Sequence, residues 1–168
     1  LEYLMRKGGA EGVSFDTIVV TGANSSKPHG VPGDTPIASG DFVTIDFGAI
    51  YDGYHSDTTR TVAVGDISPE MARVYDTVLA AQLAGVRGAR AGMTTADTDA
   101  LCRDIITEAG YGDYFGHGTG HGVGVEIHEA PTASPRSTET LQPGNVITIE
   151  PGIYLPGKFG VRIEDVVI

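Results

Sequence analysis

Short apolar runs with strand character dominate the first third of the chain. Three of them combine β-branched and aromatic residues and predict strands: residues 14–21, 41–51 and 54–64. The last two runs are separated only by Asp52-Gly53, a dipeptide that favours a tight hairpin because both turn residues need a positive φ. The pattern therefore predicts an antiparallel pair of strands on either side of this turn.

Two stretches with helical spacing follow, at residues 69–88 and 94–109. Ser68 and Thr94 are favourable N-caps for them, because a hydroxyl oxygen accepts a hydrogen bond from a free amide of the first turn. Two further strand patterns come later in the chain, at 146–149 and 161–168. This order of strands, helices and strands predicts one α+β domain.

Both ends of the chain interrupt a predicted element. Residues 1–7 have the spacing of the last turns of a helix, and the apolar stretch 161–168 has no turn signal after it. We therefore expect the 168 residues to be part of a longer polypeptide.

The charge composition narrows the range of partners. Eleven lysine and arginine residues against 22 aspartate and glutamate residues give a net charge of −11. A chain this acidic is not expected to bind nucleic acid or an anionic membrane surface. No apolar run reaches the roughly 18 residues that a membrane span needs, and the single cysteine, Cys102, suits a reducing compartment. These features predict a cytoplasmic protein.

The predicted hairpin brings two carboxylates together. With a two-residue turn, the register places Asp46 opposite Thr59 and Gly48 opposite Asp57. Positions two apart on a strand share a face, so Asp46 and Asp57 become diagonal neighbours about 7–8 Å apart. Two carboxylates at this separation repel each other unless a cation lies between them. Taken alone, the pair also fits two solvated acids on an exposed strand.

A glycine-rich segment carries most of the histidines. Between Gly116 and Gly124, glycine alternates with other residues, and His117 and His121 are four positions apart. Five glycines disfavour a helix, so we expect an extended path that approaches a ligand closely. The spacing matches neither a dinucleotide-binding fingerprint nor a phosphate-binding loop. With His128 just downstream, the segment is a candidate site.

Two further acids lie within apolar strand patterns. Glu150 directly follows the run 146–149, and Glu164 lies inside the final apolar stretch. A carboxylate among β-branched residues is costly to bury unless it is paired or binds a metal. For Glu164, a salt bridge with Arg162 is the simpler interpretation. Four carboxylates and a histidine together would suit two divalent ions such as Mn, Co or Fe.

At these residues the sequence resembles the metal-dependent pita-bread peptidases of family M24, in the branch of the Xaa-Pro aminopeptidases and prolidases. The matching stretches occur in the family's order: residues 28–30, 45–48, 56–61, 116–124, 128–129, 149–154 and 161–165. The resemblance implies an α+β pita-bread fold, with a curved antiparallel β-sheet and helices packed on its outer face. It also implies that residues 1–168 are a catalytic domain, truncated at both ends, whose upstream N-terminal domain is absent.

The resemblance further implies a dinuclear metal site. Its ligands would be two aspartates, a histidine and two glutamates: Asp46, Asp57, His121, Glu150 and Glu164. Asp57 and Glu164 would bridge both ions. Asp46 would complete the coordination of one ion, and His121 with Glu150 that of the other. Manganese is the expected metal, with Co, Fe and Zn as alternatives.

The implied activity is hydrolysis of the peptide bond between an N-terminal residue and a following proline, by a metal-activated water. By resemblance, Glu150 would transfer the proton, His128 would stabilise the tetrahedral intermediate, and His29 would help to bind the substrate near the scissile bond. His29 and His128 would thus be both catalytic and substrate-binding. The other expected substrate-binding residues are His117, Arg162 and Tyr154, of which Tyr154 suits core packing equally well.

Several alternatives remain open at this point. An Xaa-Pro aminopeptidase is the leading expectation, and an Xaa-Pro dipeptidase (prolidase) is the alternative. Methionine aminopeptidases differ around the glycine-histidine segment, and a metal-free relative of the creatine-hydrolysing enzymes would not need all five ligand residues. A non-catalytic peptide-binding module would gain nothing from four acids in one cleft. The expected partners are peptides with proline in the second position, and the full-length protein is expected to be a homodimer.

Overall fold

The computed structural model describes residues 1–168. A short helix and six strands precede two long helices, and six further strands follow them. The helices are α1 (Glu2–Lys7), α2 (Pro69–Gly88) and α3 (Thr95–Glu108), with short 3-10 helices η1 (Gly22–Ser26) and η2 (Gly112–Tyr114). The strands are β1 (Gly12–Val13), β2 (Ile18–Thr21), β3 (Phe42–Phe47), β4 (Ala49–Tyr51), β5 (Tyr54–His55), β6 (Thr58–Ala63), β7 (Gly120–Gly122), β8 (Glu129–Ala133), β9 (Ile147–Ile149), β10 (Gly152–Leu155), β11 (Phe159–Arg162) and β12 (Asp165–Val167).

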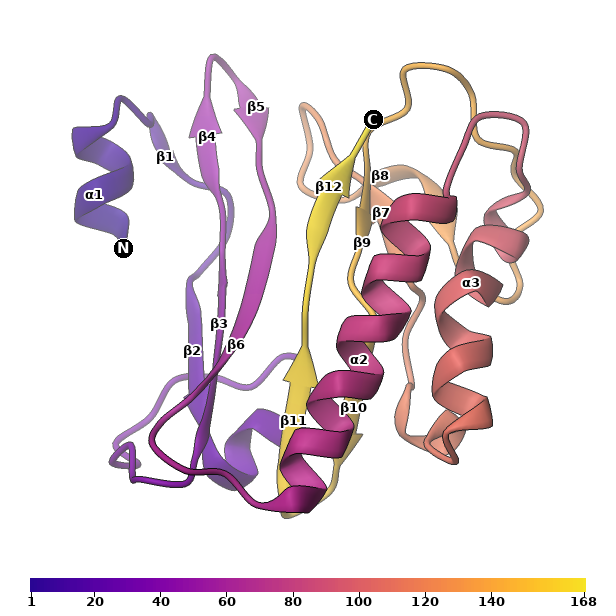
Figure 1. The fold of residues 1–168 in the computed structure, drawn as a ribbon. Coiled ribbons are helices and arrows are strands. Elements are labelled where there is room, and N and C mark those ends of the chain that lie inside the picture. The colour runs from indigo at the N-terminus through magenta and orange to yellow at the C-terminus, as the bar shows by residue number, and fades with distance from the viewer.

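Every strand pairing is antiparallel. The strands are ordered β2-β3-β6, β12-β9-β7-β8, β10-β11 and β1-β4-β5. In Figure 1, β2, β3 and β6 lie on one side of the molecule, β11 and β12 run through its middle, and α2 and α3 lie side by side beyond them. The architecture is therefore α+β, as the order of patterns predicts.

The predicted hairpin register is confirmed. Tyr51 pairs with Tyr54, and Asp46 pairs with Thr59. Asp52 and Gly53 have φ values of 51° and 75°, as the two-residue turn requires. The expectation of two continuous strands is wrong, because each is broken near Gly48. A side chain there would place its Cβ 1.9 Å from the Ser56 carbonyl oxygen, so only glycine permits this close approach of the two chains.

Other strand predictions need correction as well. Of residues 14–21 only β2 is part of the sheet with β3, and residues 161–168 contain the end of β11 and all of β12 with a break at residues 163–164. The local sequence patterns above predict neither the hairpin of β10 and β11 nor the sheet strands β7 and β8. The missed signal for the β10–β11 hairpin is Pro156-Gly157, a turn dipeptide between two apolar runs.

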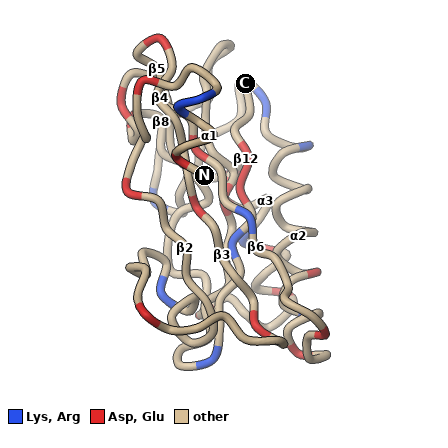
Figure 2. The backbone as a smooth tube through the Cα atoms, turned by 90° about the vertical axis from the view of Figure 1, so that its left-hand side faces the viewer, with Lys and Arg blue, Asp and Glu red and all other residues tan.

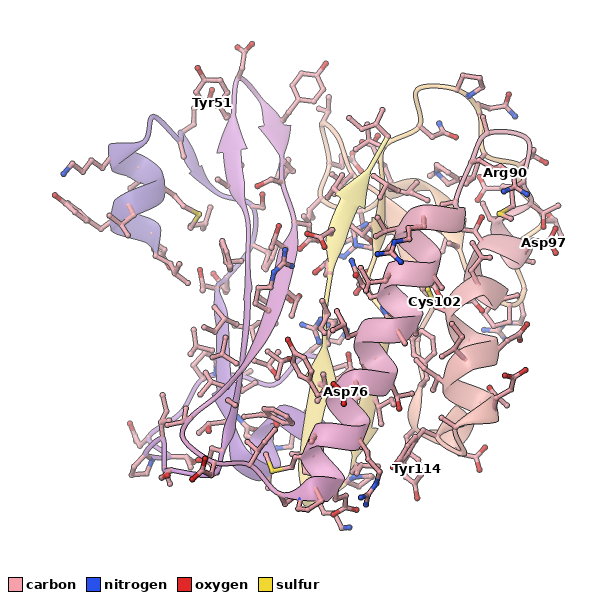
Figure 3. All side chains as sticks on the ribbon, in the orientation of Figure 1. Tyr51, Asp76, Arg90, Asp97, Cys102 and Tyr114 are labelled. Atoms are coloured by element: carbon pink, nitrogen blue, oxygen red, sulfur yellow. The ribbon has the colours of Figure 1, made fainter.

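Both long helices begin at the predicted caps and close over the core. The Ser68 hydroxyl accepts a hydrogen bond from the Met71 amide, and the Thr94 hydroxyl accepts one from the Asp97 amide. Apolar side chains of α2, α3, β9, β10 and β11 form one buried cluster. Cys102 lies within it, between the two helices (Figure 3), and its thiol donates to the Ala81 carbonyl at 3.2 Å. Burial raises the pKa of this thiol to about 12, as expected of a core residue.

The acidic residues are spread along the whole backbone rather than gathered in one segment (Figure 2). Neither long helix contains an apolar stretch that could cross a membrane. The distribution of acidic residues along the backbone therefore does not by itself mark a site.

Candidate active site

A cavity of about 550 Å³ is lined by strand and loop residues, and by none from α2 or α3. It gathers residues from stretches far apart in the sequence. The sequence-predicted site residues that line it are His29, Asp46, Asp57, His117, His121, His128, Glu150, Arg162 and Glu164. Tyr154 does not line the cavity but is hydrogen-bonded to two residues that do. The structure thus brings all the predicted residues into one neighbourhood.

Three of the four carboxylates lie where the strand ladders are interrupted, and Asp46 lies within the β3–β6 ladder. The β9–β12 and β10–β11 ladders share one register, and both stop where Glu150 lies opposite Glu164. In the first hairpin, Asp57 likewise lies in the gap between β5 and β6, opposite Gly48 in the same register. At these gaps the side chains are not fixed by regular pleating, so acids from two hairpins can point into one cavity.

Arg162 is the only lysine or arginine that lines this cavity. Its Nη2 donates to Asp46 Oδ2 at 2.6 Å, and its Nη1 donates at 3.0 Å to both the Tyr154 hydroxyl and the Pro28 carbonyl. Arg162 is 4% exposed, so this ion pair is buried. The two Nη atoms of Arg162 are therefore hydrogen-bonded to three neighbouring groups.

Glu164 does not form the salt bridge with Arg162 that is the simpler interpretation of the sequence. Glu164 accepts instead from the Thr59 hydroxyl at 2.6 Å, and Arg162 Nε donates to that same hydroxyl at 3.1 Å. The strand is interrupted at residues 163–164, between β11 and β12, so Glu164 does not share a strand face with Arg162. Thr59 thus links the arginine to the glutamate, and this residue was missed in the sequence, although the predicted register already places it opposite Asp46.

Burial and repulsion among the acids change their protonation. Burial, followed by the Asp46 and Glu150 carboxylates, raises the pKa of Asp57 to about 7. Burial and the neighbouring Glu150 and Asp57 carboxylates raise the pKa of Glu164 well above its usual range. The pKa of Glu150 is lowered, because a hydrogen bond and the charge of His121 outweigh the effect of burial. Without a further cation, the cluster therefore holds protons that ordinary carboxylates would release at neutral pH.

His121 lies against these acids with one ring nitrogen directed at them. Its Nδ1 lies 2.9 Å from the Gly122 carbonyl, which can only accept, so Nδ1 carries the proton. Its Nε2 lies 3.3 Å from Glu150 Oε1 and 3.6 Å from Asp57 Oδ2. Burial lowers the pKa of His121, but the hydrogen bond to Glu150 and the nearby carboxylates raise it overall. In the neutral form, this tautomer presents Nε2 as a ligand atom.

The buried Thr148 hydroxyl connects two of these residues. It accepts from the His121 amide at 3.0 Å and donates to Glu150 Oε1 at 3.1 Å. Gly120 lets β7 approach this strand, since a Cβ there would lie 1.8 Å from the Thr148 carbonyl oxygen. Thr148 was also missed in the sequence, where it appears only as one β-branched residue of a strand.

His117 has both ring nitrogens hydrogen-bonded within the protein. Its Nδ1 donates to the Gly118 carbonyl at 2.8 Å. Its Nε2 lies 2.8 Å from the Tyr154 hydroxyl, which accepts from Arg162 and therefore donates its own proton to His117. Burial lowers the pKa of His117, in keeping with a neutral ring. His117 consequently offers the cavity the carbon atoms of its ring rather than a hydrogen-bonding nitrogen.

His29 and His128 differ from the other histidines because both are exposed. The His128 ring lies 4.3 Å from the ring of His121, centroid to centroid. Burial and, after it, the charge of His121 lower the pKa of His128, so its imidazole is neutral at pH 7. These two side chains line the cavity and are accessible to a ligand within it.

The donor set fits divalent cations. Ligand atoms of Asp57, His121 and Glu164 lie within 4.8 Å of one another. Asp46 Oδ1 and Glu164 Oε1 are buried and have no hydrogen-bond partner. A buried carboxylate oxygen without a partner is unfavourable, and a bound cation would supply one. Carboxylates with one imidazole suit Mn, Fe, Co and Zn.

Known proteins share this structure. The Xaa-Pro dipeptidase from Bacillus anthracis is 58% identical, with a TM-score of 0.98 over 99% of this chain and 47% of its own. The X-Pro aminopeptidase from Thermotoga maritima is 50% identical, with a TM-score of 0.95 over 99% of this chain and 47% of its own. Among curated sequences, the Xaa-Pro dipeptidase of Pyrococcus furiosus is 52% identical over 168 residues, which is 100% of this chain and 48% of that protein.

The chain thus spans about half the length of the curated relatives it matches. Its close agreement with the solved prolidases confirms the pita-bread fold expected from the sequence, with α2 and α3 packed against the strands. The family model for metallopeptidase family M24 matches residues 1–168. The chain belongs to metallopeptidase family M24.

Proposed function

We propose that this chain carries the catalytic site of a metal-dependent Xaa-Pro dipeptidase. The observation that supports this most directly is the cluster of four carboxylates and His121 around one cavity, with two buried carboxylate oxygens that lack partners. Relatives named Xaa-Pro dipeptidase or prolidase, 49–58% identical, favour cleavage of dipeptides. This reverses the order of the two candidates expected from the sequence, where the aminopeptidase came first.

The proposed ligands of two divalent ions, with manganese as the proposed metal, are Asp46, Asp57, His121, Glu150 and Glu164. When bound, the ions would lower the pKa of a water molecule and polarise the scissile carbonyl. The raised pKa values of Asp57 and Glu164 support this assignment, because burial and neighbouring carboxylates raise them and a bound cation would offset both effects. The Nδ1–H tautomer of His121 supports it as well, since it leaves Nε2 as the ligand atom.

The remaining chemistry is assigned to residues of the chain. Glu150 is ionised, so its carboxylate can accept a proton from water and deliver it to the proline nitrogen that leaves. His128 is accessible and lies beside His121, where its ring can donate a hydrogen bond to the oxygen that becomes negative. His29, on the loop after η1, would bind the substrate near the scissile bond.

The wall of the substrate pocket is assigned to three connected residues. Arg162 holds the Tyr154 hydroxyl, and Tyr154 in turn holds the ring of His117. Because both nitrogens of His117 are engaged, its ring would contact the apolar proline ring rather than a polar group. Tyr154 would act behind this wall, since it does not reach the cavity itself.

An Xaa-Pro aminopeptidase is the second candidate, and the contacts of Arg162 favour it. A dipeptidase must accommodate the substrate's terminal carboxylate, yet the guanidinium of Arg162 is already bound to Asp46, Tyr154 and the Pro28 carbonyl. Longer peptides do not place that charge next to the proline. The similarity to the X-Pro aminopeptidase of Thermotoga maritima supports the same candidate.

Three peptides separate the candidates. The intact protein would be dialysed against a chelator, supplied with Mn²⁺, and incubated with Ala-Pro, Ala-Pro-Ala and Met-Ala-Ser, with the products followed by mass spectrometry. Cleavage of Ala-Pro supports the dipeptidase, and cleavage of Ala-Pro-Ala alone supports the aminopeptidase. If none is cleaved with Mn²⁺, Co²⁺ or Zn²⁺, a non-catalytic peptide-binding module replaces both.

A further inference from the structure

The segment that carries His117 is not held by any strand ladder. Residues 116–118 lie between η2 and β7 and take part in no backbone–backbone hydrogen bond. On its upstream side, the Phe115 amide donates to the Gly112 carbonyl at 3.3 Å, and downstream the Thr119 carbonyl accepts from the Glu150 amide at 2.7 Å. His117 nevertheless lines the cavity with its ring in a defined orientation. Something other than the sheet must therefore fix this segment.

Two side chains of α3 supply the missing contacts. Arg103 donates from Nη1 to the Phe115 carbonyl at 2.9 Å and from Nη2 to the His117 carbonyl at 2.6 Å. One turn earlier, Asp99 Oδ1 accepts from the Thr119 amide at 2.9 Å. The segment is thus bound at three backbone positions to one helix face.

The two side chains also hold each other. Arg103 Nε lies 2.6 Å from Asp99 Oδ2, and its Nη2 lies 2.9 Å from Oδ1, so the pair is bidentate. The Asp99 side chain is 2% exposed and that of Arg103 is 22% exposed, so solvent screens the pair only weakly. Two side chains at positions i and i+4 of a helix are pre-aligned by the helix itself. Asp99 and Arg103 therefore form a rigid pair, which we call the clamp.

The aromatic ring of Phe115 extends the clamp to the imidazole. The Arg103 guanidinium carbon lies 4.1 Å above the centre of the Phe115 ring. The Phe115 ring then meets the His117 ring edge to face, with centroids 5.1 Å apart. Arg103 therefore contacts the backbone of His117 directly and its ring through Phe115.

We infer that Asp99 and Arg103 are positioning residues that hold His117 in place as a wall of the substrate pocket. The role of His117 as a pocket wall rests on the proposed function. The contacts of Asp99 and Arg103 with the backbone of residues 115–119 do not depend on it. An arginine is required because its planar fork reaches a carboxylate and two carbonyls at once, and a lysine ammonium cannot match that geometry.

The test compares Arg103→Lys with Arg87→Lys, a matched change of an exposed arginine in the last turn of α2. In the intact metal-loaded protein, hydrogen exchange of the Thr119 amide should accelerate roughly 10-fold in Arg103→Lys, as expected when a charge-assisted contact is lost. Exchange in β9 should stay unchanged in both variants. Unaltered exchange at Thr119 would overturn the clamp.

Kinetics then test the role in the pocket. With Ala-Pro as substrate, Arg103→Lys should lower kcat/KM about 10-fold, mostly through KM, because a misplaced wall weakens substrate positioning. In a His117→Ala background the same change should have almost no further effect, because it acts through His117. Equal losses in both backgrounds would contradict the inference.

Two further measures keep the outcomes separable. Asp99→Asn retains an acceptor for the Thr119 amide but loses the charge, so it should accelerate exchange of that amide less than Arg103→Lys does. If Arg103→Lys fails to fold, Asp99→Asn replaces it in the test. If the wild-type protein cleaves no Xaa-Pro peptide, the proposed function fails, while the exchange result still decides whether the clamp holds His117.

Discussion

Arg162 Nη2 lies 2.6 Å from Asp46 Oδ2, in an ion pair whose side chains are only 5% and 12% exposed. The pair links β11 to β3 and so connects two separate sheets at the cavity. The arginine pairs with one carboxylate of the cluster, yet burial and the neighbouring carboxylates, Asp46 included, still raise the pKa values of Asp57 and Glu164. The pair therefore holds the site together in the absence of metal, while the other acids make the site favourable for cations.

Replacing this arginine should destabilise the metal-free protein. Arg162→Met leaves the Asp46 carboxylate buried without its partner, which costs about 3–5 kcal/mol for a buried pair. The free energy of unfolding in urea, measured after dialysis against a chelator, checks this. Lys158→Met is the control, because it breaks the exposed pair with Glu70 and should leave the midpoint unchanged. Equal midpoints for both variants would show that Arg162 has no structural role.

Removing the Thr59 hydroxyl should weaken metal binding. The fully buried Thr59 donates to Glu164 Oε2 and accepts from Arg162 Nε, so it orients a proposed ligand. Loss of such a supporting hydrogen bond lowers metal affinity about 10–100-fold. Thr59→Val, compared with Thr59→Ser, would be measured by titration calorimetry with Mn²⁺. A normal affinity in Thr59→Val would exclude this role, and Thr59→Ser should retain most of the wild-type affinity.

The metal-free protein should lose stability as the pH rises from 5 to 8. The pKa of Asp57 is about 7 in the folded chain, above its ordinary value of 3.8, so the folded state binds more protons than the unfolded state in this window. The raised pKa values of Glu164 and His121 act in the same direction. The lowered pKa values of His117 and His128 act in the opposite direction, so they reduce the slope around their ordinary pKa of 6.5. Chemical unfolding at several pH values checks this.

Two comparisons isolate the cause of that pH dependence. Asp57→Asn, which cannot ionise, should flatten the decline between pH 5 and 8. Added Mn²⁺ should stabilise the protein more at pH 8 than at pH 5, because metal and protons compete for the same ligands. A stability of the metal-free protein that rises throughout this range would be incompatible with the assigned shifts.

Tyr154→Phe should release the ring of His117. The hydroxyl donates to His117 Nε2, so its loss frees that nitrogen while the bond from Nδ1 to the Gly118 carbonyl remains. Nitrogen NMR of the histidine rings should show the Nδ1–H tautomer of His117 in the wild-type protein and an altered Nε2 shift in the variant. An Nε2–H tautomer in the wild type would contradict the assignment. His121 in the same spectra provides the internal control.

The sequence was sufficient to place the first two acids. The Asp52-Gly53 turn fixes the register of its hairpin, which puts Asp46 opposite Thr59 and Asp57 opposite Gly48. The helix boundaries were also predictable, because Ser68 and Thr94 cap their helices through local hydrogen bonds. In each case the determining interaction lies within a few residues in the sequence.

Other features depend on contacts that local patterns do not contain. The partner of Arg162 is Asp46, 116 positions away, and Glu164 is not the partner because the strand is interrupted between β11 and β12. The four-residue spacing of Asp99 and Arg103 on a predicted helix could indicate their ion pair. It could not indicate that the two side chains also bind the backbone of residues 115–119. The roles of the buried threonines were invisible for the same reason.

The most direct test of the account uses one substrate and two carboxylate variants. Ala-Pro cleavage and bound metal would be measured for the wild type, for Asp57→Asn and for Asp16→Asn, which alters an exposed acid lining the same cavity outside the cluster. Wild type and Asp16→Asn should bind Mn²⁺ and cleave Ala-Pro only when it is present, and Asp57→Asn should lose both metal and activity. Cleavage by the chelator-treated wild type, or full metal content and activity in Asp57→Asn, would contradict the account.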